Sequence, residues 1–380
     1  MLSTTLSISI LVQHTNCIQI KHNQLYQHRK RHSYYTCGVE WNPQFLSTSS
    51  KPSSLDKLVD SVDYFVLPDL PSKYSQDDRA NFFKRIPYEK QMTTLATCRH
   101  TTKESLLHKT MTEFSSSSIL LVSGDDKNQI STTDQPVLSS IDAARILLSR
   151  VSTEGQHCPE NDEYDDDSRR LKSTSSGDND KNNKLVLWSV INPNDPNSIE
   201  HIHNKINVGG ITNFITQPFL SSNATHIFHS YPMKSTSASN TTSDIRYVIG
   251  MAMPQTTTNL LYWIRLLEQP ELIHDPLFQR HVEYFASLED TTTSTRSPSH
   301  HDDDSNRKML KFSKMSEWIQ NEISYITSHT ITTTTDGDDD SSSCSETTRT
   351  IDGFHFMPIN KVNDKLDPLI HIIQELKMQE

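Results

Sequence analysis

The sequence predicts an α/β fold, a (β/α)8 TIM barrel with long low-complexity loop insertions. Two observations predict this fold class. Short apolar runs alternate along the chain with segments of helical periodicity, which is typical of βαβ units and a parallel sheet. In addition, the polar residues are concentrated in blocks, and the rest of the 380-residue chain is long enough for a barrel of roughly 250 residues.

Eight segments are predicted to form the strands. Each is a short run rich in aliphatic, β-branched or aromatic side chains, the composition that favours strands. In chain order they are 37–41, 64–67, 92–97, 119–122, 184–190, 213–216, 246–251 and 353–357. Eight is the strand number of this barrel class, so the count itself supports the fold.

Helical patterns separate these strands, and one more follows the last strand. Between Ile141 and Leu148, for example, the apolar residues recur at helical rather than alternating spacing. The predicted helices are 54–62, 76–86, 103–114, 139–151, 198–208, 258–267, 306–326 and 366–377. We expect them to cover the outside of the barrel.

The chain divides into a leader, residues 1–36, and the barrel, residues 37–380. The leader contains no Asp or Glu but several Lys, Arg and Ser/Thr residues, a composition typical of organelle transit peptides. We therefore expect a mitochondrial or other organellar location, with a cytoplasmic protein carrying a disordered tail as the alternative. Within the barrel, tracts of Ser, Thr, Asp and Asn near 155–183, 289–305 and 332–350 are predicted to be disordered insertions.

Composition excludes several classes of protein. The net charge of -11 comes largely from acidic runs in the insertions and argues against nucleic acid as a partner. No run of about 18 apolar residues is present, so no membrane-spanning helix is predicted. The five cysteines are an odd set without a CxxC pair, so we predict neither a disulfide framework nor a metal site.

Candidate site residues lie where predicted strands end, because barrel enzymes place their chemistry at the carboxyl ends of the strands. Glu40 lies near the end of the first strand, and Ser123-Gly124-Asp125 follows the fourth. Gln217 follows the sixth strand, and Asn360 follows the eighth. A carboxyl group there can act as a general acid, and an amide offers both a donor and an acceptor to a ligand.

The motifs at these strand ends keep one order along the chain. They are Leu-Ala-Thr-Cys at 95–98, Val-Ser-Gly-Asp at 122–125, Asn-Pro at 192–193, Val-Gly-Gly at 208–210 after Lys205, Ile-Thr-Gln at 215–217, Gly-Met-Ala-Met-Pro at 250–254, and Phe-His-Phe followed by Asn at 354–360. In this order they resemble the motifs of methylenetetrahydrofolate reductases. The resemblance covers about residues 37–377, interrupted by the insertions.

The resemblance implies an FAD flavoprotein of one-carbon metabolism and methionine biosynthesis. Such an oxidoreductase uses NAD(P)H to reduce 5,10-methylenetetrahydrofolate to 5-methyltetrahydrofolate. The implied partners are the folate substrate and the nicotinamide nucleotide, and assembly into a homo-oligomer stays open.

Carried over residue by residue, the resemblance implies a role for each matching position. Glu40 and Asp125 are the catalytic candidates, Glu40 as general acid and Asp125 beside the flavin and pterin. The substrate-binding candidates are Gln217, Asn360 and Lys361. The cofactor-binding candidates are Leu95, Ser123, Gly124, Asp125, Trp188, Asn192 and Lys205.

One alternative function stays open. Leu67, Leu95 and Ser123 stand where the family has other residues, among them hydrogen-bond donors to the flavin. Losing such donors weakens cofactor binding. The alternative is therefore a catalytically impaired barrel of the same family that acts as a binding or regulatory subunit.

Overall fold

The computed structural model of the chain describes residues 35–42, 52–69, 74–113, 118–123, 137–154, 185–227, 245–254, 256–293, 303–333, 347–349, 351–357 and 366–378. Internal contacts divide the chain into two compact units. The larger unit, Thr36–Ile373, contains the barrel, and the smaller one comprises Met1–Tyr35 and Gln374–Glu380. The predicted leader lies outside the described residues except for its last two.

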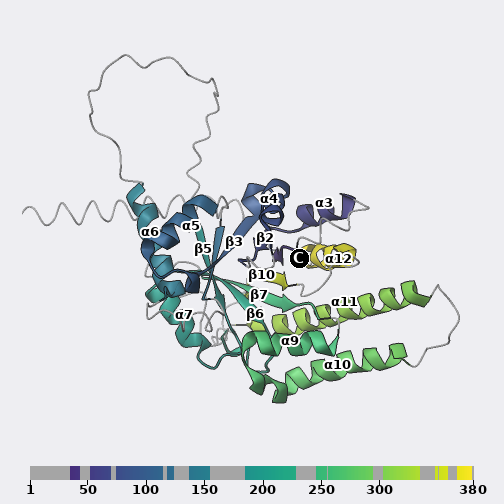
Figure 1. Ribbon diagram of the computed structural model, residues 1–380. Coiled ribbons are helices and arrows are strands. Elements are labelled where there is room, and N and C mark those ends of the chain that lie inside the picture. Colours follow the sequence, from purple (N-terminus) through teal and green to yellow (C-terminus); the bar gives the residue numbers. More distant parts are fainter. Residues whose placement is uncertain are drawn as a thin grey trace, which may run out of the picture. The chain divides into compact units, whose positions relative to one another are not determined.

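Eight parallel strands close into a barrel, which confirms the predicted fold class. The strands are β1 (Thr36–Glu40), β2 (Tyr64–Leu67), β3 (Gln91–Ala96), β4 (Ser118–Val122), β5 (Val186–Ile191), β6 (Asn213–Pro218), β7 (Arg246–Ala252) and β10 (Gly353–Met357). Their order around the barrel is β1-β10-β7-β6-β5-β4-β3-β2. The pairing of β2 with β1 closes the barrel. The strands stand at the centre of Figure 1, surrounded by helices.

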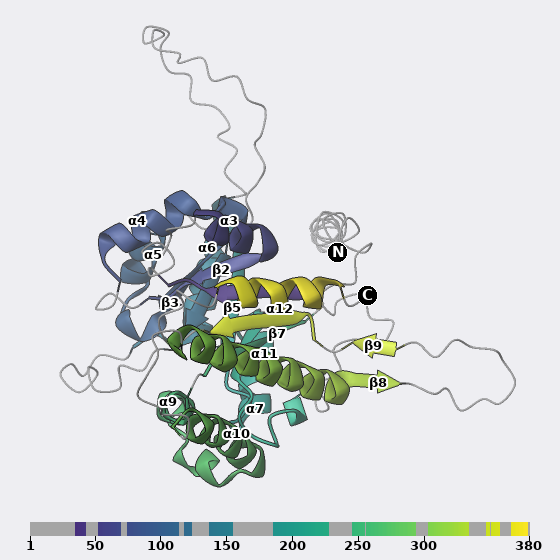
Figure 2. The ribbon, with the colours of Figure 1, turned by 90° about the vertical axis from the view of Figure 1, so that its right-hand side faces the viewer.

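The helices alternate with the strands, as the sequence predicts. They are α3 (Pro52–Ser61), α4 (Gln76–Arg85), α5 (Lys103–Glu113), α6 (Ser140–Glu154), α7 (Ser198–Asn207), α9 (Thr257–Leu267), α10 (Pro276–Thr293), α11 (Asp303–Thr330) and α12 (Leu366–Met378). Within the described part of the chain, the short 3-10 helices η1 (Tyr88–Lys90), η2 (Thr97–Arg99) and η5 (Pro270–His274) lie between them. In Figure 2, α11 and α12 run along opposite sides of β10.

The described residues reach only the edges of two predicted insertions. Residues 155–183 lie outside the described part of the chain, whereas α10 and α11 extend into the 289–305 tract from either side. At the edges of the 332–350 tract, β8 (Ile331–Thr333) pairs antiparallel with β9 (Thr347–Arg349).

Among the helices whose full extent the structure describes, α10 is absent from the sequence prediction. Its start carries a recognisable signal, because Asp275 precedes Pro276 and the Asp275 carboxylate accepts the backbone N–H of Leu277 at 2.8 Å. A capping Asp followed by Pro at the first helical position is a typical helix start. The buried face of α10 includes His281, which interrupts the apolar pattern that would otherwise identify the helix.

The barrel interior is a packed core. Side chains along a strand alternate between the interior and the helical layer. Seven interior side chains form one buried cluster: Tyr64, Val66, Met92, Leu120, Trp188, Ile215 and Val248. Gly38 of β1 makes room for this cluster, because a Cβ atom there would lie 2.1 Å from Cζ of Tyr64.

The outer faces of the strands pack against the helices. Trp41, directly after β1, meets Phe65 of β2 and Phe82 of α4 edge-on, with ring centroids 6.1 Å and 5.4 Å apart. All three rings are fully buried. Edge-to-face pairs of this kind contribute about 0.5–1.5 kcal/mol each beyond burial of their area.

A β-bulge near the end of β6 changes the register toward β7. Ile215 pairs with Val248, but Pro218 pairs with Gly250, so three steps on β6 face two on β7. Gly250 is required here, since a Cβ atom on it would lie 2.0 Å from the carbonyl oxygen of Thr216. Bulges next to functional sites re-aim side chains, and this one lies at Gln217.

Candidate active site

Glu40 lies at the carboxyl-terminal mouth of the barrel, where enzymes of this fold hold their substrates. It ends β1, pairs in register with Val66, and follows Gly38 by two residues, so it shares the interior side of the strand. Its side chain is half-buried. The Glu40 carboxyl therefore lies at the boundary between the packed interior and solvent.

Tyr74 forms part of the surroundings of Glu40. Its buried hydroxyl donates to the carbonyl oxygen of Trp41 at 3.1 Å. Burial first, and the negative charge of Glu40 second, raise the pKa of the Tyr74 hydroxyl. The Trp41 ring faces the helical layer, whereas the Tyr74 hydroxyl lies close enough to Glu40 to be affected by its charge.

Gln217 lies at the end of β6, and the segment after it is held by a residue that the sequence did not point to. The Asn194 side chain donates to the carbonyl oxygen of Pro218 at 2.8 Å and accepts the N–H of Leu220 at 2.9 Å. One amide thus ties the loop after β5 to the strand end that carries Gln217. Gln217 itself is half-buried.

Ser123 and Asn192 also lie at strand ends. Ser123 directly follows β4, is exposed, and accepts the backbone N–H of Cys98 at 3.3 Å through its carbonyl oxygen. Asn192 directly follows β5, and its side-chain oxygen accepts the backbone N–H of Asn194 at 3.0 Å. Asn192 therefore shapes the loop that positions Asn194.

Trp188 and Leu95 lie away from the mouth. Trp188 belongs to the interior cluster and pairs with Leu120 of β4, well below the strand ends. Leu95 pairs with Leu121 on the opposite side of β3 from Met92, so it is buried beneath the helices. The Leu95 side chain packs in the barrel wall, and the Trp188 side chain packs in the core.

A stack of rings forms the floor under the mouth. Tyr64 lies between His355 and Trp188, with ring centroids 5.7 Å and 6.0 Å away, and the His355 ring is nearly parallel to it at 7°. Burial lowers the pKa of His355 to about 3, so its imidazole is neutral. The register of His355 with Gly38 places this floor one interior position below Glu40.

Lys205 is a half-buried cation in the last turn of α7. Its ammonium group donates to the carbonyl oxygen of Val190 in β5. Burial lowers the pKa of Lys205 to about 8. Among the described residues no carboxylate lies within ion-pair distance of this ammonium, so its charge is uncompensated and suited to an anion.

Asp69, after β2, is the centre of a charged cluster that the sequence did not reveal. Its side chain is 1% exposed and lies 3.1 Å from Lys109, 3.2 Å from Arg99 and 3.9 Å from Arg79. It also accepts the backbone N–H of Ala96 at 3.1 Å. The Asp69 cluster therefore fixes the strand ends of β2 and β3 beside β1 and Glu40.

Four predicted site residues, Gly124, Asp125, Asn360 and Lys361, lie outside the described residues. Within the described ranges, no three His, Cys, Asp or Glu side chains gather as they would around a metal ion. The described helices include none with the length and apolar character needed to cross a membrane.

No protein-family model matches this sequence, and no curated protein is significantly similar to it. The established result is the (β/α)8 barrel itself. That fold hosts many unrelated reactions, so the residues at the mouth, and not the fold, determine the reaction.

Proposed function

We propose that this protein is a flavin-dependent oxidoreductase of the methylenetetrahydrofolate reductase type. One observation carries the proposal. Three residues that match the family's motifs, Glu40, Asn192 and Gln217, lie at the carboxyl ends of three different strands of one barrel. Motif order along the chain does not require such a placement, but a shared substrate site does.

The proposed overall reaction converts NAD(P)H, one proton and 5,10-methylenetetrahydrofolate into NAD(P)+ and 5-methyltetrahydrofolate. FAD, when bound, supplies the hydride chemistry that connects the nucleotide to the folate. The carbon–nitrogen bond of the methylene bridge breaks, and the methylene carbon gains the hydride. A proton must reach the nitrogen that leaves the bridge.

Glu40 is the proposed donor of that proton. It is half-buried at the mouth, beside the protonated hydroxyl of Tyr74. A carboxyl group at this place can act as a general acid toward a substrate bound at the mouth. A positioned general acid contributes about 10²–10⁴-fold to such a step.

Lys205 is the proposed partner of the cofactor's phosphates. Its ammonium has no carboxylate partner among the described residues, and a nearby anionic group would favour its charged form. A hydrogen bond to a charged partner contributes about 1.5–3 kcal/mol. Gln217, next to the bulge, is the proposed amide that binds the pterin.

A barrel that binds folate without flavin is the second candidate. Leu67 and Leu95 are almost fully buried in the barrel wall and offer no donor to a cofactor. The site then depends on Lys205, Asn192, Ser123 and the region of Asp125 for cofactor affinity. A binding or regulatory subunit follows if that affinity is lost.

The test is cofactor binding by the full chain. The purified protein is mixed with FAD, and its visible absorbance is followed after addition of NADH or NADPH without oxygen. We expect a yellow protein whose absorbance near 450 nm is bleached by one of the two nucleotides. A colourless protein that takes up no added FAD contradicts the proposal, and folate binding by that protein establishes the second candidate.

A further inference from the structure

The cations of the Asp69 cluster outnumber its single carboxylate. They come from three different elements: Arg79 from α4, Arg99 from η2 and Lys109 from α5. An oxygen of the Asp69 carboxylate lies within 3.9 Å of each of them. These four side chains therefore bring two more positive charges than negative ones to one point of the structure.

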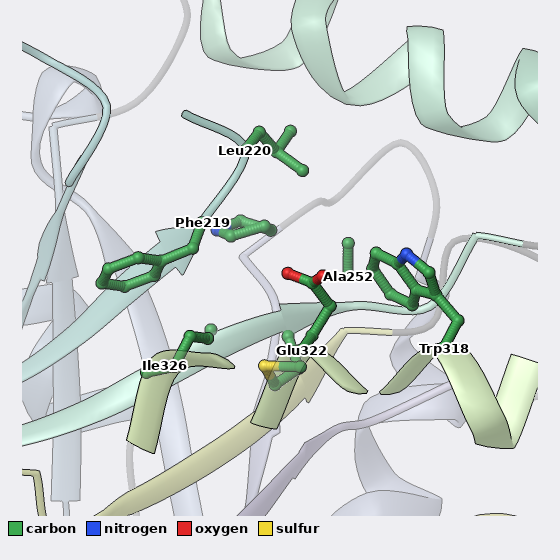
Figure 3. A pocket seen from close by; sticks show the side chains of 9 residues that line it. Phe219, Leu220, Ala252, Trp318, Glu322 and Ile326 are labelled. Carbon is green, nitrogen blue, oxygen red and sulfur yellow. The ribbon is translucent and has the colours of Figure 1, made fainter. Parts of the chain in front are cut away.

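Another buried acid of the fold, Glu322 of α11, lacks such an excess. Figure 3 shows its carboxyl group among the apolar walls of a small cavity, which include Trp318 and Ile326. The cavity has room for about one water molecule and for no larger ligand. Oε2 of Glu322 lies 3.6 Å from Nε2 of His281, one basic group for one acid. The Asp69 cluster differs because it gathers three cations around one acid.

Asp69 uses both of its carboxylate oxygens within the fold. Oδ2 accepts the backbone N–H of Ala96 at 3.1 Å, and both oxygens accept the ammonium of Lys109. Arg99 donates to the Asp69 carbonyl oxygen at 2.9 Å, whereas Arg79, at 3.9 Å from the carboxylate, is beyond hydrogen-bond distance. Arg79 and Arg99 take part in further interactions as well, and a guanidinium group has five N–H donors to share among them. Asp69 thus fixes where the cations gather.

The cations are the exposed part of the cluster. Asp69 follows β2 and Arg99 follows β3, both at the carboxyl ends where barrel enzymes bind their substrates. The Asp69 side chain is 1% exposed, but the side chains of Arg79 and Lys109 are 17% exposed and that of Arg99 is 27% exposed. A ligand at the mouth can therefore reach the cations while the carboxylate stays covered.

Neighbouring acidic side chains have contacts of their own. Asp78, next to Arg79 on α4, closes the capping box of its helix and accepts the backbone N–H of Ser75 at 2.9 Å. Asp63, before β2, accepts a backbone N–H of β1 at 2.8 Å. Glu40, at the end of β1, is the proposed proton donor. The Asp78 and Asp63 carboxylates are thus engaged elsewhere in the fold.

We propose that the Asp69 cluster binds a phosphate monoester, and that in the proposed reaction this group is the 2′-phosphate of NADPH. A phosphate monoester carries about 1.5 to 2 negative charges near neutral pH on a single phosphorus, which matches a compact excess of two positive charges. Two carboxylates of a ligand would spread the same charge over two separate groups. Arginine and lysine both recognise phosphate, and arginine does so through paired N–H donors.

The assignment to NADPH rests on the proposed function, whereas binding of a phosphate monoester does not. NADPH differs from NADH only by this monoester. The bridging phosphates of both nucleotides and of FAD carry one negative charge on each phosphorus. The Asp69 cluster would therefore select NADPH over NADH by its dianion.

Calorimetric titration of the full chain in phosphate-free buffer at about pH 8, where a monoester is a dianion, tests the ligand class. The probes are 2′-AMP and 2′,3′-cyclic AMP, a diester that has the same nucleoside and one negative charge. We expect 2′-AMP to bind roughly tenfold tighter or more, and inorganic phosphate to compete with it. For the same reason we expect NADP+ to bind roughly tenfold tighter than NAD+ or more.

Variants separate this site from a general effect of charge. Arg79→Gln removes one cation of the cluster and leaves the hydrogen-bonded contacts of Asp69 with Lys109 and Arg99 in place. We expect its affinity for 2′-AMP to fall roughly tenfold and its affinity for 2′,3′-cyclic AMP to fall less. Arg85→Gln removes an exposed arginine of the same helix and is the matched control, with both affinities unchanged.

Equal affinities of the wild type for 2′-AMP and 2′,3′-cyclic AMP overturn the phosphate site, and this result needs no variant. Equal losses in Arg79→Gln and Arg85→Gln overturn it as well, because they reflect net charge alone. If 2′-AMP and inorganic phosphate bind but NADP+ binds no better than NAD+, the phosphate site is supported and its assignment to NADPH is wrong. A protein that takes up no FAD can still be titrated with 2′-AMP, so failure of the proposed function and failure of the phosphate site are separate results.

Discussion

The carboxylate of Asp69 accepts two hydrogen bonds from the ammonium of Lys109, at 3.1 and 3.2 Å, across a separation of 40 residues. Arg99 joins this pair through both the side chain and the carbonyl oxygen of Asp69. One buried anion thus holds cations from α5 and η2 against the end of β2. The strand ends beside Glu40 depend on this contact.

Asp69→Ala is expected to lower the free energy of unfolding by about 2–4 kcal/mol, because it leaves partly buried cations without their anion. Urea denaturation at neutral pH measures the change. Glu317→Ala, which breaks the exposed pair with Lys314, is the control and is expected to cost less than about 1 kcal/mol. Equal effects of the two variants would show that the Asp69 cluster is not a stabilising unit.

Gly38→Ala is expected to destabilise the barrel by about 1–3 kcal/mol or more, because the new methyl group meets the Tyr64 ring. Replacing Tyr64 by the smaller Leu removes the clash. We therefore expect the double variant Gly38→Ala/Tyr64→Leu to be more stable than the sum of the single changes predicts, by about 1 kcal/mol or more. Strict additivity in thermal denaturation would contradict the packing described for the interior.

Lys205→Met is expected to act in opposite directions on stability and on cofactor affinity. The Lys205 pKa falls from 10.5 to about 8 on folding, so between these pH values the unfolded chain binds more protons. The free energy of unfolding of the wild type therefore rises with pH across this interval. Below about pH 8 the charged Lys205 lowers the free energy of unfolding by its full amount. The Met variant lacks this dependence.

Two measurements check the prediction for Lys205. Without cofactor, we expect Lys205→Met to be more stable than the wild type at pH 7 and to lose this advantage by about pH 10.5. With FAD, we expect affinity to fall about 10- to 150-fold, the equivalent of 1.5–3 kcal/mol. Lys205→Arg, which keeps a cation at this position, is measured in parallel. Unchanged FAD affinity in Lys205→Met would show that Lys205 does not bind the phosphates of the cofactor.

Asn194→Ala is expected to release the segment after Gln217, because the Asn194 side chain holds Pro218 and Leu220 by two hydrogen bonds. If Gln217 binds the pterin, the KM for the folate rises about tenfold while the reduction of the cofactor by the nucleotide is unaffected. Asn194→Asp keeps the acceptor for Leu220 and is expected to lose less. An effect on stability alone, with an unchanged KM, would remove Asn194 from the positioning of the site.

The strands of the barrel can be predicted from sequence because each is a compact apolar run between polar segments. Each predicted strand begins and ends within two residues of the observed strand. The bulge at Gln217 cannot be predicted from an apolar run in the sequence. It depends on the pairing of β6 with β7 and on the close approach of Gly250 to Thr216.

The same distinction applies to the candidate site residues. Glu40 and Gln217 are predictable because strand ends are visible in the sequence. Asp69 looks like a loop residue, and only contacts to cations many positions away make it a buried centre. Glu322 looks like a surface residue of a predicted helix, and α10, the helix that was not predicted, supplies the His281 that faces it.

The most direct test of the central claim is a stopped-flow comparison of wild-type protein with Glu40→Gln, both loaded with FAD. Glu104→Gln, an exposed change on α5, is the control. We expect Glu40→Gln to leave the reduction of the cofactor by NAD(P)H unchanged and to slow its reoxidation by 5,10-methylenetetrahydrofolate by about 10²-fold or more. Reoxidation by the folate at the wild-type rate in Glu40→Gln would contradict the proposed role of Glu40.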